Sequence, residues 1–223
     1  MANLREGDEA AARTALAQLC QIYWQPIYAF LRRAGHPPAD AEDGAQGFFA
    51  YLISHDKLLE AGPERGKLRT FLLGRLKGWL ATQQRTAARL KRGGGQTALS
   101  IDAEEFEQRL PAELVDAHTP DVAFDRAWLV TVLGRALEGL RAECEAEGKG
   151  AQFAALQPML TEGAEENYAT VAARIGTSEG AARVAVHRLR ARYRERLLRE
   201  VADTVDGPQE LGGELAELFA AAR

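Results

Sequence analysis

Apolar residues recur at spacings of three and four along most of this chain, the spacing that gives a helix one buried face. Ala and Leu are abundant and runs of β-branched residues are few, so we expect an all-α protein. Pro26 is expected either to kink the first helix or to open a second one. The pattern predicts helices over 13–33, 40–53, 65–92, 124–146 and 152–160, a helix pair within 168–199, and a last helix from 206 onward.

Breaks in this pattern divide the chain into two small helical domains joined by an acidic linker. The first domain is expected at 1–92 and ends before a run of three glycines. Residues 93–125 carry eight acids against a single base and lack a sustained helical period, so they are predicted to be the linker. The linker is either a solvated tether or a strand that lies in a basic channel of a partner. The second domain is expected at 126–200, followed by a C-terminal helical extension at 201–223.

The segment 168–199 predicts two helices joined by a tight turn. Gly176 allows the backbone a positive φ, and Thr177 and Ser178 are placed to cap the helix that follows. Eight of the 28 Lys and Arg lie at 174–199, against two acids, although the net charge of the whole chain is -4. A helix-turn-helix with donor-rich side chains at the start of its second helix fits the DNA major groove, where Arg binds guanine through two hydrogen bonds. A helical hairpin with a solvated basic face is the alternative.

The segment 65–92 is the other exceptional stretch, because it holds nine Lys and Arg and no acid. Surface helices normally mix charges of both signs, so a run of this length indicates contacts with phosphates. Phe71 and Trp79 lie among the cations and resemble a platform that receives an unstacked base of single-stranded DNA. Packing of both aromatic side chains in the core is the alternative.

Other kinds of chemistry receive little support from the sequence. Asp40, Glu42 and Asp43 cluster at the start of a predicted helix, where carboxylates complement the helix dipole, and no second cluster completes a metal site or an acid/base pair. Cys20 and Cys144 are isolated, which argues against a disulfide framework and a zinc site. We therefore expect no cofactor, no metal and no enzymatic activity. The lack of a signal peptide and of a long apolar stretch predicts a cytoplasmic protein that does not contact a membrane.

Taken in order, these segments resemble the ECF subfamily of bacterial RNA polymerase sigma factors, from about residue 10 to residue 200. The family's segment that docks on the coiled-coil helices of the largest polymerase subunit resembles DAEDGAQGFFAYL at 40–52. The part that opens and reads the promoter -10 element resembles GKLRTFLLGRLKGWL followed by RTAARLKR, within 66–92. The helix-turn-helix that reads the -35 element resembles EENYATVAARIGTSEGAARVAVHRLRARYRERL at 165–197.

The resemblance implies a transcription initiation factor that binds core RNA polymerase and directs promoter recognition and opening. Its partners would be core polymerase, single-stranded -10 DNA, duplex -35 DNA and an anti-sigma factor. The residues that would bind the polymerase are Asp40, Glu42, Asp43, Gln46 and Phe49. Those that would bind the -10 DNA are Lys67, Leu68, Arg69, Gly74, Arg75, Lys77, Arg85, Arg89, Lys91 and Arg92. Those that would bind the -35 DNA are Ser178, Arg183, Val184, His187, Arg188 and Arg190.

Some features depart from the family pattern. Gly44, Gly47 and Gly74 stand where the family often has larger residues, and Gly44 and Gly47 permit close approach of another helix, which we interpret as a docking surface. The C-terminal extension exceeds the two-domain plan, and its apolar stripe predicts packing on the second domain or on the polymerase, with an effect on activity. A free-standing helix-turn-helix regulator that binds an operator without polymerase is the alternative function.

Overall fold

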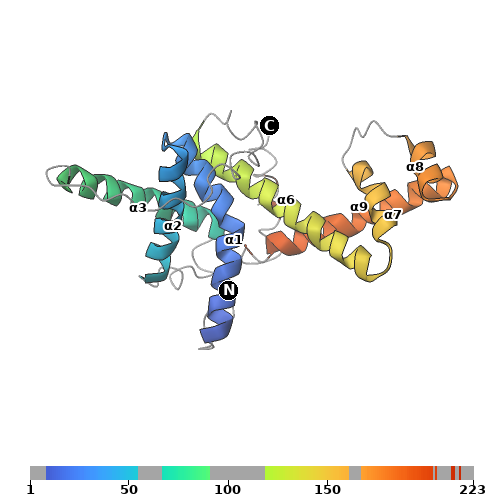
Figure 1. Cartoon of the computed structure of the whole chain (residues 1–223), viewed down its shortest axis with the longest axis horizontal. Coiled ribbons are helices and arrows are strands. Elements are labelled where there is room, and N and C mark those ends of the chain that lie inside the picture. The colour runs from blue at the N-terminus through green and yellow to red at the C-terminus, as the bar shows by residue number, and fades with distance from the viewer. Residues whose placement is uncertain are drawn as a thin grey trace. The chain divides into compact units, whose positions relative to one another are not determined.

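The computed structural model describes residues 9–54, 67–90, 119–160, 167–202, 204, 212–213 and 216. All regular secondary structure in these ranges is helical, which confirms the all-α prediction for the described part of the chain. The elements are α1 (Glu9–Arg33), α2 (Pro38–Ser54), α3 (Leu68–Leu90), α6 (Pro120–Ala146), α7 (Gly150–Leu156), the 3-10 helix η4 (Gln157–Leu160), α8 (Tyr168–Arg174) and α9 (Glu179–Ala202) (Figure 1).

The chain divides into two compact units, and one helix contributes to both. The first unit comprises Met1–Thr131 and Asp203–Arg223, and the second comprises Val132–Ala202. Residues 120–131 of α6 therefore belong to the first unit and the rest of α6 belongs to the second. Residues 93–118 of the predicted linker, and most of the predicted C-terminal helix, lie outside the described residues.

Prolines set the starts of α2 and α6. Proline is favoured at the first position of a helix, because its missing N–H has no intrahelical acceptor there and its φ is already helical. α2 begins at Pro38, so Asp40 lies in its first turn rather than at the cap, and α6 begins at Pro120, earlier than the sequence predicted. α1 is continuous across the buried Pro26, so this proline does not open a second helix.

The core of the first unit is built where α1 packs against α2 (Figure 1). Tyr23, Ile27 and Leu31 recur every four residues on one face of α1 and are fully buried. The largest fully buried side chains from the other helices of this unit are Phe48, Leu52, Leu72, Leu76, Phe124 and Trp128. Burying one such side chain contributes roughly 1.5–3 kcal/mol, so this apolar face accounts for much of the stability of the unit.

The start of α6 is part of this same core. The ring of Phe124 lies 6.4 Å from that of Tyr23, and the ring of Trp128 lies 6.5 Å from it, measured between centroids. Ala29 of α1 packs with Ala123 and Ala127 in a small buried cluster. Phe124, at the end of the predicted linker, and Trp128, in the predicted second domain, thus pack with α1 in the first unit.

Gly44 and Gly47 allow close approach, but by helices of their own unit. A Cβ on Gly44 would lie 3.1 Å from Leu31 Cδ1, and a Cβ on Gly47 would lie 3.3 Å from Trp79 Cζ2. Both distances are tighter than ordinary van der Waals contact. We therefore attribute these two glycines to the packing of α2 against α1 and α3, instead of to a docking surface for a partner.

The second unit surrounds one buried cluster of apolar side chains from α6, α7, η4, α8 and α9. Its members are Leu140, Cys144, Phe153, Leu156, Met159, Val171, Val186 and Leu189. The turn from α8 into α9 follows the sequence prediction. Gly176 has φ +66°, and Ser178 Oγ accepts a hydrogen bond from the N–H of Ala181 at 3.3 Å, which caps α9.

Candidate nucleic-acid interface

The arginines of α9 fall into two groups with different surroundings. Arg190, Arg192 and Arg196 are partly buried and bind groups of their own unit. Arg183, Arg188, Arg194 and Arg199 are exposed, on the sides of α9 that do not hold Val186 and Leu189. Only the second group is available to a polyanion.

Arg190 closes the 3-10 helix and is not positioned as a DNA contact. Its Nε and Nη2 both donate to the carbonyl oxygen of Met159, at 3.0 and 2.7 Å. The last carbonyls of a helix lack intrahelical donors, so a guanidinium that supplies two hydrogen bonds there satisfies a group that is otherwise costly to bury. Arg190 was among the -35 contacts that the family resemblance implied. The structure places its guanidinium at η4.

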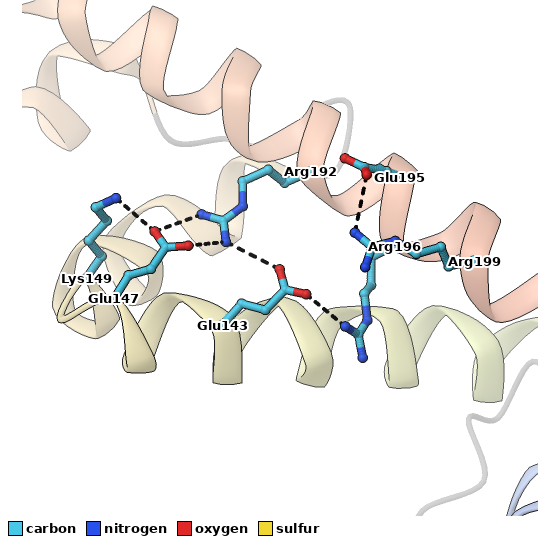
Figure 2. Close-up of polar contacts among 7 residues, drawn as sticks. All are labelled: Glu143, Glu147, Lys149, Arg192, Glu195, Arg196 and Arg199. Carbon is cyan, nitrogen blue, oxygen red and sulfur yellow. Dashed lines mark hydrogen bonds and ion pairs between the residues drawn. The ribbon is translucent and has the colours of Figure 1, made fainter.

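An alternating row of guanidinium groups and carboxylates joins α9 to the end of α6 (Figure 2). Arg192 Nη2 donates to Glu147 Oε1 at 2.7 Å and to Glu143 Oε2 at 3.3 Å. Arg196 Nη1 donates to the other oxygen of Glu143 at 2.8 Å, and Lys149 Nζ donates to Glu147 Oε2 at 2.8 Å. Hydrogen bonds from Lys149 and Arg192 lower the pKa of the Glu147 carboxyl. Because Arg192, Arg196 and Lys149 are paired with these carboxylates, their charges do not add to the exposed positive surface of the second unit.

The open face of α9 holds four of the residues that we expected at the -35 DNA. Arg183, Val184, His187 and Arg188 are all exposed, and Val184 is 50% exposed despite being apolar. The side chains of His187 and Arg188 form no ion pair or hydrogen bond with any other residue of the described ranges. Ser178, the remaining predicted contact, is exposed but uses its hydroxyl as the cap of α9.

Three further residues of this surface are absent from the predicted set of -35 contacts, although Glu179 and Arg194 were expected on this face of the helix. Arg194 is exposed and lies seven residues after His187, hence on the same side of α9. Glu179 and Tyr168 both contact Arg183, through an ion pair and a ring contact respectively. The i,i+4 spacing of Glu179 and Arg183 was a usable signal for the ion pair. No sequence signal joins Tyr168 to Arg183, because they lie on different helices.

On α3, two of the predicted -10 cations are bound by acids of α6. Arg69 is buried and pairs with Asp125, with side chains 7% and 22% exposed. Lys77 Nζ lies 2.6 Å from Asp121 Oδ2, with side chains 49% and 47% exposed. Arg69 is therefore not on the open side of the helix, where we expected it to border a base. Lys77 lies at the surface.

The remaining predicted residues of α3 have mixed surroundings. Leu68 is buried, and its N–H donates to the carbonyl oxygen of Thr204 at 3.2 Å. Gly74 and Arg85 are exposed, and a Cβ on Gly74 would meet no atom within 4 Å. Lys67 is partly exposed. The side chain of Arg89, and all of Lys91 and Arg92, lie outside the described part of the chain.

The two aromatic side chains of α3 do not form an open platform together. The ring of Trp79 lies 5.7 Å from that of Phe48 in the core, so core packing describes it better. Phe71 is partly exposed, and the guanidinium carbon of Arg75 lies 5.1 Å from its ring centroid. Such a pair is a cation–π contact at the surface of α3.

The residues expected to bind the polymerase are also divided between the surface and the interior. Asp40, Asp43 and Gln46 are exposed and recur every three residues along α2. Glu42 is partly buried. Phe49 is buried and stacks on Trp24, with ring centroids 6.2 Å apart, so it serves the core and is not open to a partner.

Within the described ranges, no group of three or more His, Cys, Asp or Glu is arranged to hold a metal ion. No helix of those ranges combines the length and the apolar character needed to cross a membrane. Comparisons with protein-family models, with curated proteins and with solved structures found no match.

The two ion pairs of α3 differ in burial, so replacing their cations by Met should change the free energy of unfolding by different amounts. Arg69→Met removes the largely buried Arg69–Asp125 ion pair, and we expect it to lower the free energy of unfolding by about 3 kcal/mol. Lys77→Met breaks an exposed pair and should change it by less than about 1 kcal/mol. All three tryptophans, Trp24, Trp79 and Trp128, lie in the first unit, so urea unfolding followed by tryptophan fluorescence measures both variants. Equal losses would contradict the assignment of Arg69 to the interior.

The lowered pKa of Glu147 predicts a pH-dependent contribution to the second unit. A carboxyl whose pKa is lower in the folded state stabilises that state fully above its unfolded value, about 4.3, and the stabilisation is lost as the pH falls through the folded value. We expect protection of the α9 amides from hydrogen exchange to decrease below about pH 4.3 less steeply in Glu147→Gln than in the wild type. Glu145→Gln is the matched control, because Glu145 forms no ion pair within the described ranges. An unchanged slope in Glu147→Gln would contradict this account.

Proposed function

We propose that this chain is a transcription initiation factor of the ECF sigma type, which binds core RNA polymerase and directs it to promoters. The observation that carries the proposal is the open face of α9, which follows α8 and a glycine turn and holds Arg183, Val184, His187 and Arg188. A short helix, a tight turn and a second helix with exposed donors fit the geometry of a helix-turn-helix in the major groove. We propose that this face reads the -35 element.

The first unit would supply the other two functions of such a factor. Asp40, Asp43 and Gln46 form an exposed polar row on α2, which is suited to docking on the polymerase. α3 would contact the -10 DNA through its exposed residues, among them Gly74, Lys77 and Arg85. Arg69, Phe49 and Arg190 are removed from the contact set, because the structure uses each of them internally.

This assignment supports initiation more than a free-standing regulator. A regulator accounts for α9 but leaves the exposed cations of α3 and the acidic row of α2 without a role. It would bind an operator tightly in the absence of polymerase, usually as a dimer. The chain would catalyse no bond chemistry, and an anti-sigma factor would be a further partner.

The test is a pair of variants that separate docking from DNA reading. The full chain should co-migrate with core RNA polymerase in gel filtration and support run-off transcription from a pool of promoters. Asp43→Lys should abolish co-migration but leave binding to the preferred -35 duplex unchanged. Arg188→Ala should keep co-migration but weaken binding to that duplex about tenfold, equal to about 1.4 kcal/mol.

The proposal has clear contrary outcomes. If the wild-type chain neither co-migrates with core polymerase nor starts any transcript, the initiation function is wrong. If it binds one duplex tightly as a dimer without polymerase, the chain is a regulator. If Asp43→Lys and Arg188→Ala each lose both properties, the two faces do not have separate functions.

A further inference from the structure

Arg183 is held on two sides by residues of its own unit. Its Nη2 donates to Glu179 Oε1 at 2.7 Å, and its guanidinium carbon lies 4.8 Å from the ring centroid of Tyr168. The side chains of Arg183 and Glu179 are 62% and 51% exposed, so this arrangement is at the surface. Nε and Nη1 of Arg183 have no hydrogen-bond partner among the described residues.

Both partners of Arg183 are fixed at the start of a helix. Glu179 is the first residue of α9, immediately after the capping Ser178. Tyr168 is the first residue of α8, and it packs against the buried cluster of the second unit. The side chain of Asn167 caps α8 by accepting from the N–H of Thr170 at 2.8 Å. Neither partner therefore depends on a mobile chain segment for its position.

We propose that Glu179 and Tyr168 are specificity-determining residues, which direct Arg183 to a guanine base and away from phosphates. The inference rests on the proposed function of α9 as the base-reading helix. A carboxylate beside the guanidinium repels a phosphate, whereas guanine offers two uncharged acceptors, O6 and N7. The ring of Tyr168 holds the plane of the guanidinium, so less side-chain entropy is lost when two hydrogen bonds form.

The same face supplies an internal contrast. Arg188 and Arg194 are exposed, and neither forms an ion pair within the ranges that the structure describes. With no adjacent acid to repel phosphate, they are the cations suited to the DNA backbone, where a point charge suffices. Arg183 would thus be the base reader, and Arg188 and Arg194 would be backbone contacts.

The experiment uses the full chain bound to core RNA polymerase. The DNA duplexes that it binds contain a guanine analogue. A random duplex library first gives the preferred -35 sequence, and each guanine in it is then replaced by 7-deazaguanine, which lacks the N7 acceptor. We expect the wild type to lose about tenfold in affinity at one guanine. Glu179→Gln and Tyr168→Leu should reduce this loss to about twofold and strengthen binding to unrelated duplexes. The slope of log affinity against log salt concentration should become steeper by the equivalent of about one phosphate contact.

Two matched controls isolate the contacts of Arg183. Glu195→Gln removes the Glu195–Arg199 pair, which has the same i,i+4 spacing on the same helix at 3.4 Å. Tyr168→Phe retains the ring and removes only the hydroxyl. Both controls should keep the tenfold loss at the same guanine. Hydrogen exchange of the α9 amides checks the fold of each variant, and Glu179→Gln decides the outcome if Tyr168→Leu unfolds the unit.

The inference is overturned if Glu179→Gln keeps the full loss at that guanine. It is also overturned if Glu179→Gln instead abolishes a preference for cytosine, since a carboxylate can accept from cytosine N4 and would then be reading a base itself. Failure of the library to yield any preferred duplex, together with failure to bind core polymerase, would remove the proposed function as well. The two kinds of failure are therefore distinguishable.

Discussion

The pairing of three of the seven α9 arginines with groups of their own unit is the interaction on which the rest of the second unit depends. An arginine-rich helix repels itself and its surroundings unless some of its charge is compensated within the protein. Arg192 and Arg196 are compensated by Glu143 and Glu147, and Arg190 is bound by the carbonyl of Met159 (Figure 2). These contacts tie α9 to α6 and η4 on one side. The exposed side keeps Arg188 and Arg194 without an acidic partner among the described residues, and the candidate function depends on that asymmetry.

In the first unit, too, cations are paired with acids of the protein, and the two pairs differ in burial. Asp125 and Asp121 belong to the acidic stretch that the sequence assigned to a linker, but they lie in α6 and bind Arg69 and Lys77 of α3. The Arg69–Asp125 pair is buried and structural. The Lys77–Asp121 pair is exposed and therefore weak, so a DNA phosphate could replace Asp121 as the partner of Lys77 at little cost. The acid-free character of 65–92 is therefore partly explained by acids supplied from α6.

The sequence was sufficient for the features that depend on neighbours along the chain. Helical periodicity placed α3 and α9, and local backbone chemistry placed the turn at Gly176 with its cap at Ser178. It was not sufficient for features that depend on distant partners. No local signal identifies the partners of Arg190, Arg69 and Lys77, because Met159, Asp125 and Asp121 lie on other helices. Gly44 and Gly47 were misassigned for the same reason, since Leu31 and Trp79 lie on other helices.

The account's central claim is that the open face of α9 contacts duplex DNA. A photo-crosslinking amino acid at Val184, in the full chain bound to core polymerase on promoter DNA, tests this directly, with the same probe at the exposed Glu138 of α6 as control. The account predicts a crosslink from Val184 to one short stretch of duplex upstream of the start site, and none from Glu138. Equal crosslinking from both positions, or none from Val184 in an actively transcribing complex, would contradict it.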